Sequence, residues 1–525
     1  MRNNLNSSGG NLSNLVRRAA ERDGDRPALL FRQESISWAE LDHDVDAVSR
    51  GLAGQCAPGD RVAVALGNVP DFARVYLGAL RAELVAVPIN PSYRASELAH
   101  VLSDSGASIL VAGSGVAREV AEVRSQLPEL REVYQPGGAP GTDLAELFVA
   151  GAPVPNPSGG ENLAVLLYTS GSEGKPKGAM LSHRALLANL DQLDRIQPRL
   201  LASGDVVLVA LPLFHSYGLG PGLHAIVRHG CTGVLVERFD PTDALQRIHR
   251  HRASVVLGVS QMYLAWSLLE DVGEAFASVR LAVSGAAPLD TDTQHRFLDA
   301  TGHHVFQGYG LTEAAPVLTS TLMSPVPKPG SIGRPIPGVD LRLVGMDGHI
   351  IEIGEEDEDG TPGTDPGEVW VRGGNLFSGY WPDGRDGPDE EGWWPTADIG
   401  YADADGDLFL VDRLRELILV SGFNVYPREV EQVLEGHPAV REAAVLGVPH
   451  PYTGETVKAY LVAESETTVT ADELISYCEQ QLARFKCPTS VEFVDSLPRS
   501  VTGKVRKSAL RDGLPVPRDD QAGEA

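Results

Sequence analysis

The sequence predicts an α/β fold, in which a large N-terminal domain is built on parallel-rich sheets flanked by helices. Short continuous runs of Val, Leu and Ala alternate with segments that carry apolar residues at helical spacing, such as 38–54 and 71–81. Such runs are typical of strands buried on both faces of a parallel sheet, and the alternation favours helices packed on that sheet. The predicted strands are 61–66, 84–89, 108–111, 163–168, 206–211, 233–236, 254–258 and 281–284.

Later stretches predict two smaller parts. Between residues 333 and 373 Pro and Gly become frequent and short strand-like pieces appear, such as 340–344 and 367–371, which predicts a small β-rich subdomain. The region after residue 412 predicts a small α+β domain. We therefore place a flexible, Asn/Ser/Gly-rich tail at 1–10, the large domain at 11–411 and the small domain at 416–525. In the small domain we expect helices at 427–434 and 471–482 and strands at 443–448 and 458–462.

The composition restricts the classes of function. Among 525 residues, 71 Asp and Glu outnumber 44 Lys and Arg, which gives a net charge of −27. This charge disfavours nucleic acid as a partner, because nucleic-acid binding depends on neutralised phosphates. Cys56, Cys231, Cys478 and Cys487 form no Cys-x-x-Cys pair, so neither a disulfide framework nor a cysteine metal site is expected. We expect no signal peptide, no integral membrane segment and a cytoplasmic location.

The strongest local signal is a segment from Tyr168 to Gly178 that is rich in glycine, hydroxyl groups and lysine. Glycines let the backbone turn its N–H groups inward, and hydroxyls and lysines add donors and positive charge, which together suit phosphate. The spacing differs from that of P-loop proteins, because no Ser or Thr follows the lysines at the required position. Taken alone, the segment is also compatible with a polar connection. A helix with Ser182 as its N-cap is expected after it. The candidate phosphate ligands are Thr169, Ser170, Gly171, Ser172, Gly174 and Lys177.

Further motifs follow in order along the chain. Small residues in the motifs Ser284–Pro288 and Gln307–Glu313 would let the backbone approach a planar ring, on which Tyr309 could stack. Glu313 is a candidate Mg²⁺ ligand, because hard cations prefer carboxylate oxygens. The basic run 247–252 is expected at a helix C-terminus, where cations are favoured. The motifs are Leu211–Gly218, Ser284–Pro288, Gln307–Glu313, Thr396–Asp398 before a short strand, Asp412–Pro427 and Pro498–Lys504.

Together these motifs resemble the acyl-adenylate-forming superfamily, which contains acyl-CoA synthetases, peptide-synthetase adenylation domains and beetle luciferases. The resemblance covers nearly the whole chain and includes the order of the motifs. It implies a hinge at residues 412–415, a mobile C-terminal domain and an active site between the two domains. The chain departs from the family at Ser172 and Glu173, where two threonines are usual, at Ala397, where glycine is frequent, and at Leu419, where many relatives have lysine.

The resemblance implies how ATP and its metal are held. Lys504 would neutralise charge at the α-phosphate, and Thr312 would stabilise developing charge. Glu313 would hold Mg²⁺, with Thr169 as a second candidate ligand. Arg415 would be the pivot of the hinge. The residues that would contact ATP or AMP beyond the phosphate segment are Gly285, Ala286, Gln307, Gly308, Tyr309, Gly310, Asp398, Arg413 and Arg415.

The resemblance also implies an acyl site and a thiol site. His215 would lie between the acyl carboxylate and the phosphate, with Tyr217, Gly218 and Gly308 lining the acyl pocket. Family members that take α-amino acids typically carry an Asp near this motif, and its absence here favours an uncharged substrate tail. The residues that would contact coenzyme A are Arg238, Ser421 and Gly422.

The favoured hypothesis is a ligase for medium- or long-chain fatty acids. It would form acyl-AMP from ATP with release of pyrophosphate, and then a thioester with coenzyme A with release of AMP. The alternatives are an aryl- or small-acid CoA ligase, an acyl-AMP ligase that loads a carrier protein, and an adenylate-binding regulatory protein. Glu173 and Leu419 favour the regulatory reading slightly, and Lys504 argues against it. The sequence makes no prediction of the oligomeric state.

Overall fold

The structure is a computed structural model of the chain, which divides into two compact units. Unit 1 comprises Met1–Leu341 and Val371–Trp394, and unit 2 comprises Arg342–Trp370 and Pro395–Ala525. The predicted domain boundary near residue 411 stays a prediction. The structure describes residues 10–139, 141–169, 176–353, 363–413, 416, 418–420, 423–450, 454–464, 469–482, 484–499 and 504–511.

A nine-stranded sheet forms one half of unit 1, in the order β16-β15-β14-β13-β12-β10-β11-β1-β2. From β1 to β14 neighbouring strands are parallel, and antiparallel strands flank them at both edges. All four predicted strands between residues 206 and 284 are confirmed in it. Its strands are β1 Pro27–Phe31, β2 Glu34–Ser37, β10 Val206–Val209, β11 Thr232–Leu235, β12 Val255–Gly258, β13 Leu281–Ser284, β14 Val305–Gly310, β15 Val317–Ser320 and β16 Arg334–Pro335.

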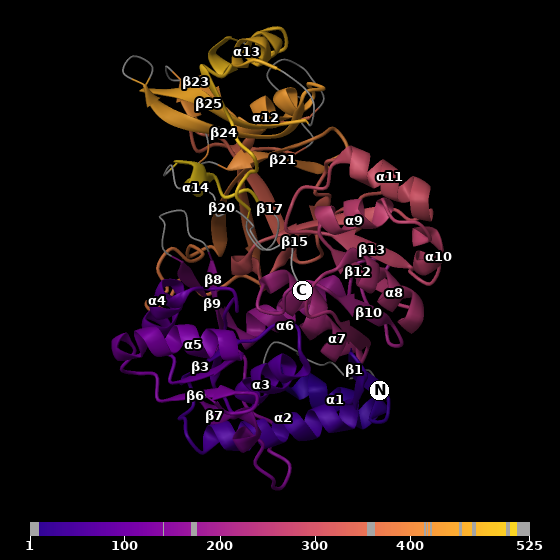
Figure 1. Ribbon diagram of the computed structural model, residues 1–525, viewed down its shortest axis with the longest axis vertical. Helices are drawn as coiled ribbons and strands as arrows, with labels where there is room; N and C mark the ends of the chain where they lie inside the picture. Colours follow the sequence, from indigo (N-terminus) through magenta and orange to yellow (C-terminus); the bar gives the residue numbers. More distant parts are fainter. Residues whose placement is uncertain are drawn as a thin grey trace, which may run out of the picture. The chain divides into compact units, whose positions relative to one another are not determined.

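Helices α8, α9, α10 and α11 lie beside strands β10, β12 and β13 (Figure 1). The basic run is at the C-terminus of α8, as predicted, with His249, Arg250 and His251 in the last turn. A π-helix, η4, precedes α7 and follows directly on the His215 motif. The helical segments of this half are α6 His183–Leu193, η4 Gly218–His224, α7 Ala225–His229, α8 Pro241–His251, α9 Ser260–Ser267, α10 Val272–Phe276, α11 Thr291–Thr301, η5 Thr312–Ala314 and η6 Thr321–Met323.

A seven-stranded sheet forms the other half of unit 1, in the order β7-β6-β5-β3-β4-β8-β9. The predicted strands between residues 61 and 168 are confirmed in it, and Ser182 is the N-cap of α6, as predicted. Strand β9 was not predicted, and it returns antiparallel to β8 from Lys177, at the end of the phosphate segment. The strands are β3 Arg61–Ala65, β4 Val85–Pro88, β5 Ile109–Ala112, β6 Glu132–Gln135, β7 Thr142–Asp143, β8 Leu163–Thr169 and β9 Lys177–Ser182.

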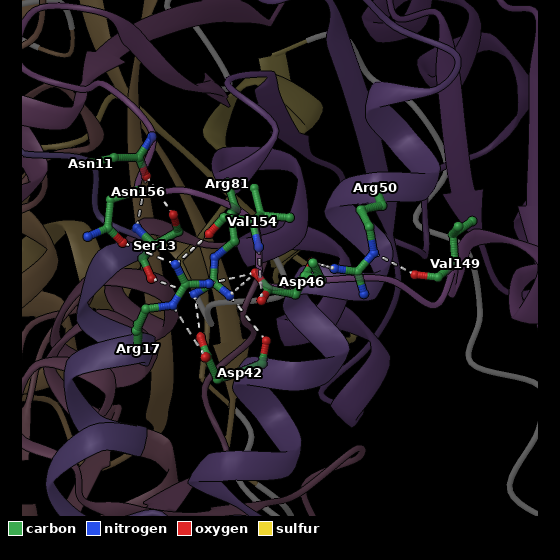
Figure 2. A network of polar contacts seen from close by, with 11 residues as sticks. Asn11, Ser13, Arg17, Asp42, Asp46, Arg50, Arg81, Val149, Val154 and Asn156 are labelled. Atoms are coloured by element: carbon green, nitrogen blue, oxygen red, sulfur yellow. Dashed lines mark hydrogen bonds and ion pairs between the residues drawn. The ribbon is translucent and has the colours of Figure 1, made fainter.

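A buried charge network joins the first three helices of unit 1 (Figure 2). Arg81 on α3 is almost fully buried and pairs with Asp42 at 2.6 Å and Asp46 at 2.8 Å, both on α2. Arg17 on α1 also pairs with Asp46, at 2.7 Å. The two arginines pair with the two aspartates, so the charges of the network balance one another within the fold. The helices of this half are α1 Asn14–Asp23, α2 Trp38–Ala53, α3 Pro70–Arg81, α4 Ala95–Ser105, α5 Ser114–Val123, η2 Arg124–Gln126 and η3 Leu144–Leu147.

A five-stranded sheet, in the order β18-β17-β19-β20-β21, forms the predicted β-rich subdomain. The chain passes from one unit to the other within strands β17, β19 and β20. The predicted strands at 340–344 and 367–371 are confirmed. Its strands are β17 Val339–Val344, β18 Ile350–Ile351, β19 Gly367–Gly373, β20 Trp393–Ala402 and β21 Leu408–Arg413.

The C-terminal part of unit 2 is the predicted α+β domain. Strands β24 and β25 form a long antiparallel pair, and β26, which was not predicted, joins β25 in parallel after helix α13. Lys507 on α14 pairs with Glu431 on α12 at 2.8 Å and with Glu416 at 2.7 Å, which holds the last described helix on this domain. The elements are β22 Ile418–Val420, β23 Phe423–Val425, α12 Pro427–Glu435, β24 Val440–His450, β25 Gly454–Ala463, α13 Ala471–Glu479, η7 Arg484–Lys486, β26 Ser490–Phe493 and α14 Lys507–Arg511.

Two further expectations concern the whole described chain. All four cysteines are free thiols in the structure. No helix among the described residues has both the length and the apolar character to cross a membrane. The cytoplasmic location stays a prediction.

Candidate active site

The phosphate segment connects strands β8 and β9, and helix α4 holds both of its ends. Thr169 and Lys177 are paired across the two strands. The hydroxyl of Tyr168 donates to the Asp104 carboxylate at 2.6 Å, and the His100 imidazole lies 2.9 Å from the carbonyl oxygen of Pro176. Burial, followed by the Asp104 hydrogen bond, raises the pKa of Tyr168, so the neutral hydroxyl remains the donor. The predicted ligands Ser170, Gly171, Ser172 and Gly174, together with Glu173, lie outside the described residues.

A segment far along the chain runs against the return strand β9. The Ser378 N–H donates to the carbonyl of Met180 at 2.9 Å, and the Met180 N–H donates to Gly379 at 3.1 Å. The Trp381 N–H donates to the carbonyl of Gly178 at 2.8 Å, and its indole N–H donates to the carbonyl of Asp104 at 2.9 Å. The end of the phosphate segment at residues 176–178 is therefore held both by α4 and by residues 378–381.

Tyr380 joins the braced strand to the predicted magnesium ligand. Its hydroxyl donates to Oε1 of Glu313 at 2.7 Å, and the Glu313 side chain is buried. The Phe377 N–H donates to the backbone carbonyl of Glu313 at 2.8 Å. The ammonium of Lys177 lies 5.3 Å from the centre of the Tyr380 ring, within cation–π range, and 3.5 Å from Asp386. Glu313 and Lys177, far apart in sequence, thus share one aromatic neighbour that the sequence did not single out.

The His215 motif meets two other predicted motifs. The Tyr217 hydroxyl donates to the carbonyl of Val283 at 3.2 Å, and a Cβ added at Gly285 would come within 2.9 Å of the Tyr217 ring. The Thr312 hydroxyl donates to the Ser216 hydroxyl at 3.4 Å. A side chain at Gly218 is excluded, because its Cβ would lie 2.2 Å from the carbonyl oxygen of Pro212. The structure therefore brings His215, Tyr217, Gly218, Gly285 and Thr312 into one neighbourhood.

The two motifs that are predicted to approach a planar ring lie at the carboxyl ends of neighbouring parallel strands. Ser284 at the end of β13 is paired with Gln307 on β14, which continues through Gly308, Tyr309 and Gly310. The Ser284 hydroxyl and the Gln307 side-chain oxygen are buried without a hydrogen-bond partner among the described residues. Ala286 follows with a φ of 65°, in the left-handed region. This is the edge at which α/β proteins bind ligands.

Asp398 and Arg413 of unit 2 are cross-strand neighbours, because they are paired between β20 and β21. Asp398 is buried, and its N–H donates to the Thr396 hydroxyl at 3.1 Å. One expectation is wrong: Thr396–Asp398 lies inside strand β20, not before a short strand. Ala397 has a φ of 60°, a conformation that costs a non-glycine residue roughly 1–2 kcal/mol, which gives a physical reason for the glycine frequent in the family.

Only some of the remaining predicted site residues belong to the described part of the structure. Arg238 is exposed and lies two residues before Asp240, the N-cap of α8. Lys504 is exposed, three residues before helix α14. Arg415, Ser421 and Gly422 lie outside the described residues, as does the side chain of Arg413.

The donor set around Glu313 fits Mg²⁺ bound together with a nucleotide. No group of three or more His, Cys, Asp or Glu side chains suitable for a metal is present in the described chain. A dedicated all-protein cage is therefore not found there. Mg²⁺ commonly uses one or two carboxylates, with phosphates and water as its other ligands. A single buried carboxylate beside a phosphate segment agrees with that pattern.

The fold of unit 1, with polar motifs at the ends of parallel strands, defines an α/β protein of the ligand-binding kind, and comparison with known proteins narrows the class. Residues 16–381 match the AMP-binding enzyme family, and residues 429–504 match the AMP-binding enzyme C-terminal domain. The chain therefore belongs to the AMP-binding enzyme family. The predicted membership and the predicted enzyme class, an AMP-forming acid–thiol ligase, are confirmed.

Individual relatives are similar along nearly their whole length. The chain is 34% identical to a long-chain-fatty-acid–CoA ligase of Yersinia pestis, over 95% of this chain and 94% of the relative. It is 37% identical to a feruloyl-CoA synthase of an Amycolatopsis species, over 91% and 94%. The crystal structure of ATP-bound MatB from Rhodopseudomonas palustris superposes with a TM-score of 0.86 at 31% identity, covering 95% of this chain and 98% of that one. The predicted fold class is confirmed.

Proposed function

We propose that this enzyme activates a carboxylic acid with ATP and transfers the acyl group to coenzyme A. The observation that supports this most is the cluster in which Tyr380 contacts both the buried Glu313 carboxylate and the Lys177 ammonium, beside the ends of the phosphate segment. A carboxylate suited to a hard cation and an ammonium suited to phosphate are thereby placed together. Both are needed to hold a magnesium nucleotide.

In the first half-reaction a carboxylate oxygen of the acid attacks the α-phosphorus of ATP. The bond from that phosphorus to the bridging oxygen breaks, pyrophosphate leaves and acyl-AMP forms. Mg²⁺, when bound at Glu313, neutralises phosphate charge. Lys177 and the phosphate-segment ligands Thr169, Ser170, Gly171, Ser172 and Gly174 orient the phosphates, Thr312 donates to developing charge, and His215 orients the acid. Positioning and charge stabilisation account for most of the catalysis of such a step.

In the second half-reaction the sulfur of coenzyme A attacks the acyl carbon. The bond from that carbon to the phosphate oxygen breaks, AMP leaves and the thiol proton passes to solvent. Lys504 serves only the first half-reaction, at the α-phosphate. Rotation about Arg415 then exchanges it for the Ser421–Gly422 segment, and Arg238 contacts coenzyme A. Asp398 and Arg413 hold the ribose in both half-reactions, which fits their pairing on adjacent strands.

The preferred acid is a medium- or long-chain fatty acid, bound along Tyr217, Gly218 and Gly308. The relative from Yersinia pestis supports this choice, and the motif around His215 carries no acidic partner for a substrate ammonium. An aryl acid is the second candidate, because the feruloyl-CoA synthase is the relative of higher identity over a slightly shorter span. Transfer to a carrier protein is a third candidate that shares the same first half-reaction.

The test is a product assay on the full chain with ATP, Mg²⁺ and coenzyme A. The assay uses a panel of five acids: acetate, octanoate, palmitate, benzoate and ferulate. The products AMP and acyl-CoA are both measured by mass spectrometry. We expect AMP and acyl-CoA in equal amounts, with octanoate or palmitate fastest. Faster turnover of ferulate would favour the aryl reading. AMP that needs carrier protein instead of coenzyme A would favour the third candidate, and no AMP with any acid would contradict the proposed function.

A further inference from the structure

Tyr380 occupies a position that no predicted motif includes. It lies on the segment that braces β9, and its hydroxyl and its ring face two different charged side chains. The hydroxyl donates to Glu313 Oε1 at 2.7 Å, and the ring centre lies 5.3 Å from the ammonium of Lys177. We propose that Tyr380 is a positioning residue that fixes the Glu313 carboxylate for the metal–nucleotide complex and holds Lys177 on the phosphate side of the same site. The inference rests on the proposed adenylation.

The backbone around Tyr380 limits how far its hydroxyl can move. The Tyr380 N–H donates to the carbonyl of Arg385 at 2.9 Å, and the carbonyl of Tyr380 accepts from the Gly384 N–H at 2.8 Å, which closes a tight turn. Gly379 and Trp381, the residues directly before and after Tyr380, are both hydrogen-bonded to β9. The phenol ring packs edge-to-face on Phe377, with ring centres 5.1 Å apart. A ring held in this way presents its hydroxyl in one direction.

The partner is restrained as well. Glu313 lies in the short helical turn η5, and its backbone carbonyl accepts from the Phe377 N–H at 2.8 Å. Asn375 donates to the carbonyl of the next residue, Ala314, at 2.7 Å. Residues 375–380 therefore hold both the backbone and the carboxylate of the Glu313 turn. Hydrogen bonds to a metal-binding carboxylate orient it, and their loss typically lowers metal affinity about 10- to 100-fold.

The Lys177 contact gives the same residue a second effect. Lys177 lies near the end of the phosphate segment and begins strand β9, and its ammonium lies near the face of the Tyr380 ring. A cation over an aromatic face is attracted by the ring quadrupole. The hydroxyl and the ring therefore have separable roles: the hydroxyl acts on the carboxylate, and the ring acts on the lysine. Removing the hydroxyl alone isolates the first role.

The experiment compares Tyr380→Phe with the wild type and with Tyr134→Phe. Tyr134 is a matched control, because its hydroxyl donates to Gln55 at 2.9 Å in the same unit and no predicted site residue takes part in that contact. The probe is Mn²⁺ with the non-reacting analogue α,β-methylene-ATP, and unbound Mn²⁺ is measured by electron paramagnetic resonance. We expect Tyr380→Phe to weaken Mn²⁺ binding in the nucleotide complex about 10-fold and Tyr134→Phe to leave it within about twofold.

A double-mutant cycle with Glu313→Gln shows whether Tyr380 acts through Glu313. In the Glu313→Gln background, the further change Tyr380→Phe should alter Mn²⁺ affinity by less than about twofold. An equal loss in both backgrounds would mean that Tyr380 acts independently of Glu313 and would overturn the inference. If Tyr380→Phe behaves like Tyr134→Phe while Glu313→Gln binds Mn²⁺ poorly, the inference fails and the proposed function stands. If Glu313→Gln binds Mn²⁺ normally, the metal role of Glu313 fails and the inference fails with it.

Discussion

Unit 1 contains two groups of interacting charged residues that differ in what their charges do. In the network of helices α1–α3, Arg17 and Arg81 meet Asp42 and Asp46 at 2.6–3.5 Å, and the Arg81 side chain is 1% exposed. In the cluster around Glu313, the hydroxyl and the ring of the neutral Tyr380 contact Glu313 and Lys177, and Lys177 also pairs with the exposed Asp386 at 3.5 Å. The first group neutralises itself with protein charges. The second presents a carboxylate and a lysine on either side of one neutral residue.

This difference separates residues that hold the fold from residues that meet a substrate. An ion pair that is buried and complete is costly to break, because removal of one partner leaves the other charge buried. A charge that a neutral scaffold positions is suited to a ligand that brings the opposite charge. We therefore expect substitutions in the first group to change stability with little effect on chemistry, and substitutions in the second to do the reverse.

The largest expected effect is on stability, from Arg81→Met. Methionine keeps much of the side-chain volume but removes the buried guanidinium from Asp42 and Asp46, which keep their contacts with Arg17. We expect unfolding of unit 1 to become easier by about 3–5 kcal/mol, the usual cost of removing one partner from a buried ion pair. Urea denaturation followed by circular dichroism measures this effect, and turnover per folded molecule should stay near the wild-type value.

Arg32→Met is the matched control for Arg81→Met. Arg32 pairs with Glu237 at 2.8 Å, but its side chain is 69% exposed. Exposed pairs contribute less than about 1 kcal/mol, so the urea midpoint should barely move. Equal destabilisation by the two substitutions would contradict the distinction between the buried network and the surface.

Lys504→Ala should give the opposite pattern, a large loss of activity without loss of stability. Lys504 is exposed, and its proposed partner is the α-phosphate of ATP. We expect acyl-adenylate formation to fall about 10²–10³-fold, the usual effect of removing one group that stabilises transition-state charge. Thioester formation from supplied acyl-adenylate should remain within about threefold, because Lys504 serves only the first half-reaction.

Arg506→Ala controls for general effects of charge removal near Lys504. Arg506 is an exposed cation two residues away. Both half-reactions should stay within about twofold of the wild type, in line with the small effect of exposed charges. Equal losses of both half-reactions in Lys504→Ala would refute the assignment of Lys504 to one step.

The smallest expected effect comes from Glu173→Thr in the phosphate segment. Removal of a carboxylate from a phosphate site relieves like-charge repulsion, so ATP affinity should stay equal or improve by about two- to threefold. Isothermal titration with α,β-methylene-ATP measures the change. A loss of affinity beyond about tenfold would show that Glu173 contacts the nucleotide complex directly.

Most of the core strands could be predicted from the sequence, because uninterrupted Val, Leu and Ala runs satisfy burial on both faces of a parallel sheet. Strands that depend on a partner were missed. Lys177–Ser182 carries only a short apolar run after a lysine and a glycine, and it forms a strand by pairing with β8. Ser490–Phe493 is short and largely exposed, and it forms on the edge of β25.

The motifs of the site could be predicted from the sequence, but the contacts between their side chains could not. Glu313 and Asp398 stand in recognisable patterns, and their order along the chain indicated the chemistry. Tyr380 is 67 residues from Glu313 and lies in an ordinary Gly-Tyr-Trp-Pro turn. The contact arises because residues 378–381 pair with β9, a strand that was itself missed. The nearest sequence signal was a cluster of aromatic and glycine residues at 377–381 without a role.

Acid-dependent exchange of labelled pyrophosphate into ATP, with coenzyme A absent, tests the central claim most directly. This exchange reports reversal of adenylate formation, so it requires the first half-reaction and no acceptor. The account predicts exchange by the wild-type protein only when a fatty or aryl acid is added, and about 10²–10³-fold less exchange by Lys504→Ala. Exchange that is independent of added acid, or none with any acid of the panel, would contradict the account.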